Sequence, residues 1–82
     1  MEELKDTVDL MLSSDYKERF KAEYYQLEIR FNKLESMVKK WDEGKLDFTP
    51  TCRRSTYDAQ LEYMHNYLIV LQERAEMENI SL

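Results

Sequence analysis

The sequence of 82 residues has almost none of the residues that build turns, disulfides or metal sites: one glycine, one proline, one cysteine and one histidine. An all-β domain needs a tight turn about every 8–12 residues, and this chain has too little glycine and proline for that. One cysteine forms no disulfide within the chain, and one cysteine with one histidine makes no zinc site. Nucleotide-binding loops that need several glycines are excluded for the same reason. Long helices are the architecture that remains.

Long hydrophobic runs are missing as well. No window approaches the roughly 18 apolar residues of a membrane span, and the first residues, Met-Glu-Glu-Leu-Lys-Asp, lack the apolar run of a secretory signal. The net charge of −5 argues against a general nucleic-acid or acidic-membrane binder, because such proteins present a basic patch. We expect a soluble intracellular protein with no bound metal or cofactor.

Apolar residues recur at heptad spacing in two segments. The first segment contains Tyr16, Phe20, Tyr24, Leu27, Phe31, Leu34, Val38 and Trp41. The second contains Tyr57, Leu61, Met64, Leu68, Leu71 and Ala75. Alternating steps of three and four residues place each set on one face of a helix. Such faces favour side-by-side antiparallel packing, so the pattern predicts an all-α fold built on a two-helix hairpin.

Capping residues set the predicted bounds of the two long helices. Asp15 followed by Glu18 resembles a capping box, and Gly44 is a natural stop, which together predict a helix over 15–43. The second helix is predicted over 56–78.

A short amphipathic helix is predicted before the first long helix, within 1–13, from Leu4, Val8, Met11 and Leu12. It either folds back on the hairpin or docks on a neighbouring subunit, and the sequence does not choose between these. The connection then covers 44–55, and 1–82 forms a single helical domain.

A further apolar stripe on the second helix consists of Tyr63, Tyr67, Val70 and Met77. A two-helix hairpin has one internal seam and cannot bury two. A chain this short also buries only about 60% of the surface that its unfolded form exposes. We therefore predict a homo-oligomer, most simply a dimer that forms a four-helix bundle. The alternative is a single broad face that the N-terminal helix covers.

The connection is the one positively charged part of the chain: residues 44–56 sum to +2, against −3 for 1–14 and −4 for 57–82. It is longer than the roughly 2–8 residues usual between bundle helices. Arg53 and Arg54 precede a helix N-terminus, where free N–H groups and the helix dipole favour anions. Hydroxyl groups and aromatic rings lie beside them. The predicted ligand-binding residues are Arg53, Arg54, Ser55, Thr56, Thr51, Phe48 and Tyr57.

These connection residues also have a purely structural interpretation. Ser55 caps its helix in that case, the two arginines pair with carboxylates of a partner, and Phe48 plugs the end of the bundle. A catalytic role for Cys52 would need a base, and His65 lies about 15 Å away along the second helix of the same subunit. The sequence therefore favours a binding protein and not an enzyme.

Three stretches resemble a family of small proteins encoded by phages and prophages of Gram-positive bacteria. They are Asp15-Tyr16-Lys17-Glu18-Arg19-Phe20, Gly44-x-Leu46-Asp47-Phe48-Thr49-Pro50-Thr51-Cys52 and Leu71-x-x-Arg74-Ala75. The Leu-Asp-Phe-Thr-Pro-x-Cys stretch is the specific part, and the resemblance covers about 15–80. It implies a phage origin and a setting in the host bacterial cytoplasm, without a known reaction.

The leading hypothesis combines this resemblance with the positive connection. Phage genomes encode small helical oligomers that sequester nucleotide signals of host immunity, an analogy of size and context. The hypothesis is a non-enzymatic phage accessory protein that binds and sequesters a small anionic nucleotide-like ligand, with arginines on phosphate, hydroxyls hydrogen-bonding to it and a stacked ring. The alternative is a helical protein-interaction module that captures a host or phage protein.

Overall fold

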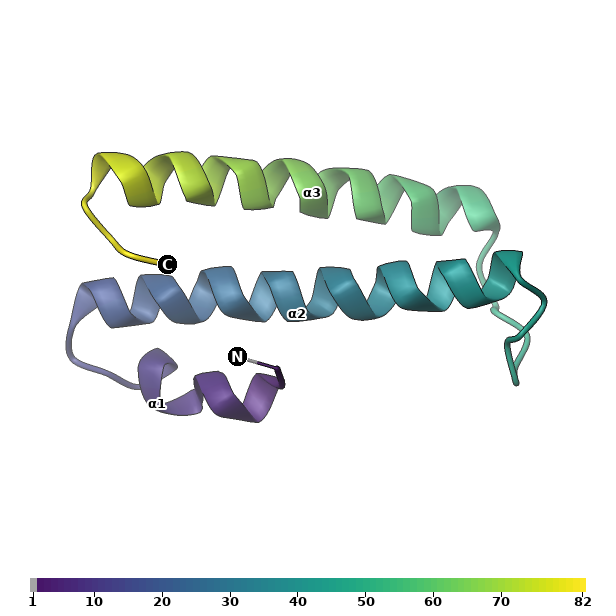
Figure 1. Ribbon diagram of the computed structural model, residues 1–82, viewed down its shortest axis with the longest axis horizontal. Coiled ribbons are helices and arrows are strands. Elements are labelled where there is room, and N and C mark those ends of the chain that lie inside the picture. The colour runs from purple at the N-terminus through teal and green to yellow at the C-terminus, as the bar shows by residue number, and fades with distance from the viewer. Residues whose placement is uncertain (1) are drawn as a thin grey trace.

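The computed structural model describes residues 2–82, so residue 1 of the predicted domain lies outside the described residues. A 3-10 turn, η1 (Leu4–Thr7), continues into α1 (Val8–Met11), and two long helices follow, α2 (Tyr16–Asp42) and α3 (Arg54–Met77). The described part is helical with no strand, which confirms the all-α prediction. α2 and α3 lie side by side and run in opposite directions, and α1 lies on the other side of α2 (Figure 1).

Both ends of α2 are held by capping residues. The Asp15 side chain accepts a hydrogen bond from the Lys17 N–H at 2.9 Å. At the other end Gly44 has a φ of +69°, and the Lys45 N–H bonds to the Lys40 carbonyl at 2.9 Å. Glycine adopts this left-handed conformation without a steric penalty, so the helix ends there.

α3 begins two residues before its predicted start. Its N-cap is Arg53, whose side chain makes no capping hydrogen bond, so Ser55 lies inside the first turn and is not the cap. At the other end Asn79 takes a left-handed φ of 57°, and the Ile80 N–H bonds to the Ala75 carbonyl at 2.8 Å. The chain thereby reverses and brings Ile80 into the core.

The core fills the seam between α2 and α3 at the end away from the connection. Its buried members are Phe20, Tyr24, Leu68, Leu71, Ala75 and Ile80, with Leu27 and Phe31 packed against them. At the connection end the rings of Trp41 and Tyr57 meet edge to face, 5.9 Å between centroids. The predicted heptad faces supply nearly all of these residues, since Ile80 alone falls outside them.

Residues 4–11, which we call the N-terminal unit, fold back on α2 of the same chain. Thr7 is fully buried, donates its hydroxyl to the Leu4 carbonyl at 2.7 Å and accepts from the Gln26 amide at 2.9 Å. The unit contacts α2 and not α3. The apolar stripe on α3 is therefore not covered by the N-terminal helix, and that alternative is wrong.

The α3 stripe stays on the surface of the described chain. Tyr63 is 71% exposed and Met77 77%, and Tyr67 and Val70 are each nearly half exposed. The homo-oligomeric bundle inferred from this stripe concerns contacts between copies, and it stays a prediction.

Candidate functional site

Arg54, one of the predicted phosphate contacts, is held by its own chain. Its guanidinium pairs with Asp42, and its Nε lies 3.0 Å from Oδ1 of Asp58. The same group lies over the Trp41 ring, 5.5 Å from the centroid. Hydrogen bonds from Arg54 lower the pKa of Asp42, and those carboxylates raise the pKa of Arg54. Two negative charges already neutralise this cation, so a phosphate would have to displace them.

Tyr57 also contacts Trp41, the ring over which Arg54 lies. Its ring and that of Trp41 meet in a T-shaped arrangement, and a hydrogen bond with the Cys52 thiol raises the pKa of the Tyr57 hydroxyl. Cys52 itself is exposed. Tyr57 is therefore already packed against Trp41, where α2 and α3 meet near the connection.

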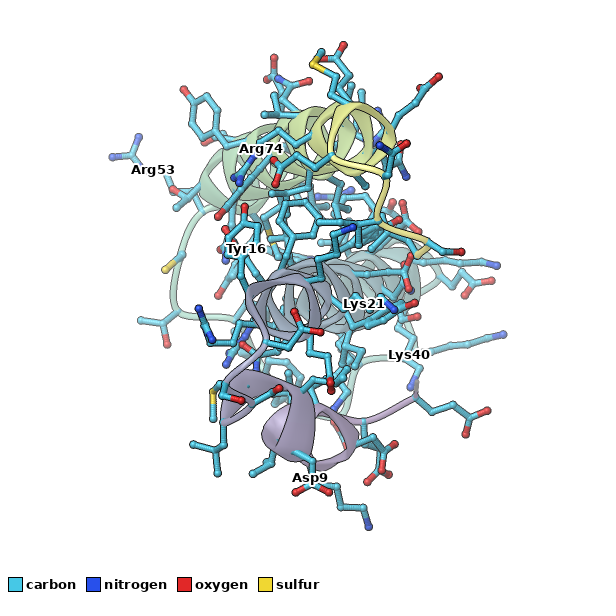
Figure 2. The ribbon with its side chains drawn as sticks, turned by 90° about the vertical axis from the view of Figure 1, so that its left-hand side faces the viewer. Asp9, Tyr16, Lys21, Lys40, Arg53 and Arg74 are labelled. Carbon is cyan, nitrogen blue, oxygen red and sulfur yellow. The ribbon has the colours of Figure 1, made fainter. Side chains whose placement is uncertain are left out.

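Arg53 points away from the helices. Figure 2 shows its side chain extending into solvent on the opposite side of the molecule from Lys40. Thr51, Ser55 and Thr56 are exposed near it in the sequence. The structure therefore gathers Arg54 and Tyr57 at Trp41 and leaves the other predicted polar residues on the open surface.

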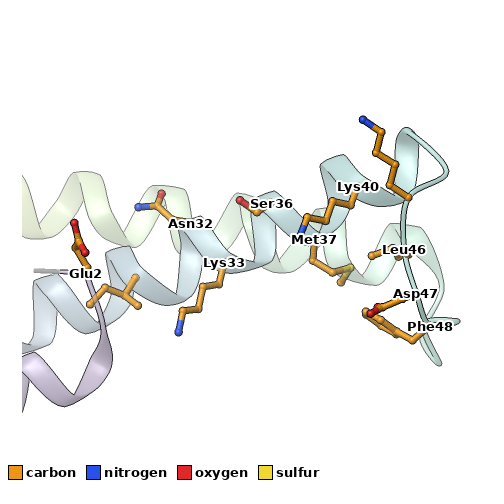
Figure 3. Close-up of a pocket in the computed structure, with 11 residues that line it drawn as sticks. Glu2, Asn32, Lys33, Ser36, Met37, Lys40, Leu46, Asp47 and Phe48 are labelled. Atoms are coloured by element: carbon orange, nitrogen blue, oxygen red, sulfur yellow. The ribbon is translucent and has the colours of Figure 1, made fainter.

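A groove lies along α2 between the N-terminal unit and the connection, with a volume of about 770 Å³ (Figure 3). Ile29 at one end of the groove is buried at 4% exposure, whereas Asn32, Lys33, Ser36 and Lys40 farther along α2 are exposed. Beyond Ile29 the face is open. The volume falls within the roughly 300–1,000 Å³ of small-molecule sites.

Three lysines line the groove: Lys33, Lys40 and Lys45. Within residues 2–82 none of them forms an ion pair. Lys33 and Lys40 are seven residues apart on one face of α2, which corresponds to about 10 Å along the axis. Glu2 and Asp47 also line the groove and offset part of this charge. The lysines leave a small positive excess in the groove.

The remaining lining is apolar, with two small polar groups. Met37 and Leu46 are half-buried, while Phe48 is 52% exposed at the connection end of the groove. Asn32 and Ser36 add an amide and a hydroxyl. A flat ring beside lysines, with hydrogen-bonding groups farther along, suits a ligand that joins an aromatic ring to an anion.

Phe48 is the predicted site residue that lines this groove, and the lysines were missed. A signal for them exists in the sequence, because Ile29, Lys33 and Lys40 follow one another at steps of four and seven residues. Those steps put the lysines on the same helix face as a buried residue. The chain reversal after Gly44 brings Lys45 and Phe48 to that face, which spacing alone does not reveal.

Three other features were considered within residues 2–82: a metal site, the single histidine and a membrane-spanning helix. No group of three or more His, Cys, Asp or Glu side chains there could hold a metal ion. His65 is exposed, and its ring lies 6.0 Å from that of Phe31. Among the helices of residues 2–82, none has the length and apolar character to cross a membrane.

The family model for Sequestin matches residues 14–77 of this chain. The chain belongs to the Sequestin family. The matched residues contain α2, the connection and α3, and hence every groove residue except Glu2, while the N-terminal unit precedes them. Comparison with curated proteins and with solved structures gave no match. The name Sequestin is consistent with a protein that sequesters a ligand, a binding role in place of catalysis.

Proposed function

We propose that this member of the Sequestin family sequesters a small anionic, nucleotide-like ligand in the α2 groove. The observation that carries the proposal is the juxtaposition of the exposed Phe48 ring with lysines that have no ion-pair partner within residues 2–82. Unpaired cations in a groove of this size favour an anion, and the ring favours a base.

Each groove residue has a distinct role in this proposal. Phe48 stacks on the base, since stacking on an aromatic side chain contributes about 1–3 kcal/mol per base. Lys40 and Lys45 contact a phosphate near that ring, and Lys33 lies about 10 Å farther along α2. Asn32 hydrogen-bonds to the sugar or to a second base. The spacing of the lysines favours a ligand with two separate anionic groups.

The connection residues predicted from the sequence provide a second location for the same ligand. Arg53 is exposed and Thr51, Ser55 and Thr56 are accessible, so they stay candidates. Arg54 would first have to leave its carboxylate partners. The groove is favoured because it combines a volume of about 770 Å³, a ring and cations without an ion-pair partner within residues 2–82.

Sequestration requires no chemical step. A bound ligand is withdrawn from solution in proportion to the amount of protein, so the activity is stoichiometric and depends on protein concentration and affinity. In this proposal the protein is a homo-oligomeric phage accessory protein of the host bacterial cytoplasm, and the ligand is an immune signal of the host. The proposal therefore assigns an anti-defence role.

Calorimetric titration tests the proposal and its location. The ligands are cyclic dinucleotides and cyclic ADP-ribose isomers, added to protein at tens of micromolar. We expect saturable heat with at least one of them, lost in Lys45→Gln and retained in Arg53→Gln. Loss in Arg53→Gln alone moves the site to the connection, and no heat with any ligand contradicts the proposal.

The second candidate function is a protein-interaction module, favoured by the exposed stripe on α3. Tyr63 and Met77 present apolar surface that a helix from another protein could cover. A pull-down from host lysate separates the two functions. A stoichiometric host or phage partner that Tyr63→Glu abolishes would support this candidate, and sequestration of a small ligand predicts none.

A further inference from the structure

A second cavity, which we call the hollow, lies between α1 and α2 and has a volume of about 420 Å³. It shares no lining residue with the α2 groove. Its lining residues on α2 follow one another at steps of three and one, which places them on one face of the helix. They are Arg19, Ala22, Glu23, Gln26, Leu27 and Arg30, and Met11 of α1 completes the lining. The volume falls within the roughly 300–1,000 Å³ of small-molecule sites.

Hydrogen bonds hold the α1 side of the hollow in place. The Gln26 amide donates to the Thr7 hydroxyl at 2.9 Å and lies 3.6 Å from the Met11 sulfur. Arg19 donates to the Ser13 carbonyl, in the turn between α1 and α2, at 2.9 Å. These contacts fix α1 against α2, so the shape of the hollow is set before a ligand arrives. A ligand therefore has little ordering cost to overcome there.

Arg30 is the cation of the hollow that has no partner in its own chain. It is exposed, and within residues 2–82 it forms no ion pair. Arg19 already donates to a carbonyl, and the Glu23 carboxylate accepts from the Tyr67 hydroxyl. Two arginines and one glutamate leave an excess of one positive charge. The hollow therefore favours a ligand with a single negative charge.

The rest of the hollow offers aliphatic surface. Ala22 is buried at 2% exposure, Leu27 is half-buried, and Met11 is 46% exposed. None of the described residues that line the hollow is aromatic. A nucleobase thus finds no ring to stack on, whereas an alkyl chain gains free energy by covering these side chains. Methionine adapts to the shape of such a chain, because its side chain is unbranched and flexible.

We propose that the hollow is a second ligand site of this protein, which binds a small aliphatic monocarboxylate. The Arg30 guanidinium pairs with the carboxylate, since the two planar groups form parallel N–H···O bonds. The alkyl chain lies against Leu27 and Met11. A nucleotide with two phosphates brings more negative charge than the hollow offsets. The hollow and the α2 groove therefore take ligands of different chemistry, and neither site depends on the other.

Titration with hexanoate, followed by nuclear magnetic resonance, tests the site without any nucleotide present. Backbone amide signals of residues 11 and 19–30 should shift and approach saturation by about 20 mM, the range expected for so small a ligand. Signals of 33–48 should stay in place. Hexan-1-ol, which has the same chain without the charge, should bind about tenfold more weakly. Equal binding of the alcohol, shifts confined to 33–48, or no shifts with hexanoate overturn the proposal.

Three charge variants test the role of Arg30. Arg30→Gln should weaken hexanoate binding about tenfold or more. Arg53→Gln is the matched control, because the Arg53 side chain extends into solvent (Figure 2), and binding should stay within about twofold. Glu23→Gln keeps an acceptor for Tyr67 and removes a like charge, so binding should strengthen about twofold to fivefold. Equal effects of the two arginine variants, or weaker binding in Glu23→Gln, overturn the proposal.

A pair of apolar variants tests the contact with the alkyl chain. Met11→Ser removes aliphatic surface from the hollow and should weaken hexanoate binding about threefold or more. Leu12→Ser is the matched control, since Leu12 is 73% exposed and does not line the hollow. Circular dichroism checks that both variants keep the parental helicity. Equal affinities in the two folded variants contradict an alkyl chain bound at Met11.

Discussion

The buried hydroxyl of Thr7 accepts a hydrogen bond from the side-chain amide of Gln26 at 2.9 Å, and this bond ties the N-terminal unit to α2. It links residues 19 positions apart and lies in a part-buried setting. Glu2, just before the N-terminal unit, lines the groove, so the bond holds the segment next to one end of the candidate site.

Thr7→Val tests that link with little change in side-chain shape. Valine cannot accept the hydrogen bond from the Gln26 amide. We expect the loss of this bond to lower the free energy of unfolding by about 1–3 kcal/mol. Hydrogen exchange of residues 4–11 should quicken while that of α3 stays slow. Thr7→Ser keeps the hydroxyl and should retain most of the protection. Equal protection in the valine variant would contradict a tethering role.

Gly44→Ala should destabilise the chain by about 1 kcal/mol, because alanine resists a φ of +69°. A Cβ at this position meets no atom within 4 Å, so backbone strain is the sole cause. Asn79→Gly provides the reverse test at the end of α3, where φ is 57°, and should be neutral or stabilising. Urea unfolding measures the stability of both variants. An unchanged midpoint for Gly44→Ala would contradict the expected backbone strain of alanine at this φ.

Leu71→Ala and Leu12→Ala form a matched pair that separates core from surface. Leu71 is 0% exposed in the core between α2 and α3, whereas Leu12 is 73% exposed. We expect a loss of about 2–5 kcal/mol for the first and less than about 0.5 kcal/mol for the second. Thermal unfolding followed by circular dichroism checks both. Similar losses would mean that Leu12 is covered in solution.

Acid should destabilise the end of the helix pair near Glu78. The Tyr16 hydroxyl donates to this carboxylate at 2.8 Å, and with Arg74 it lowers the pKa of Glu78 below its usual 4.5. A lowered folded pKa contributes stability above about pH 4.5, and that stability is lost as the pH falls through the folded value. Arg54 lowers the pKa of Asp42 in the same way.

Melting temperatures from pH 7 to pH 2 measure this effect. The parental chain should lose stability progressively below about pH 4.5, and Glu78→Gln should lose less across the same range. Glu76→Gln serves as the control, since Glu76 is exposed and its side chain makes none of these hydrogen bonds. Identical slopes in the parental chain and Glu78→Gln would show that the Tyr16 bond contributes nothing.

The sequence predicted the helices because helix periodicity and helix-ending residues are encoded by neighbouring positions of the chain. Heptad spacing placed Phe20 and Leu71 in the seam, and Gly44 marked the end of α2, where a positive φ is needed. The start of α3 was predicted two residues late, since Ser55 looked like a cap but the structure places Arg53 there.

The candidate site depended on contacts between distant residues. Arg54 looked free beside a helix N-terminus, but Asp42 lies 12 positions earlier and pairs with it once α2 and α3 are side by side. Lys40 lines the groove together with Lys45 and Phe48, which the chain reversal after Gly44 brings to its face of α2. Sequence spacing describes one element at a time and does not contain this information.

The most direct measurement of the central claim is calorimetric titration of the parental chain, Lys40→Gln and Lys39→Gln with the same nucleotide ligand. Lys40 lines the groove, whereas its neighbour Lys39 is exposed on another side of α2 and carries the same charge. We expect Lys40→Gln to weaken binding about tenfold or more and Lys39→Gln to leave it within about twofold. Equal losses in both variants, or none in either, would contradict a ligand site in the α2 groove.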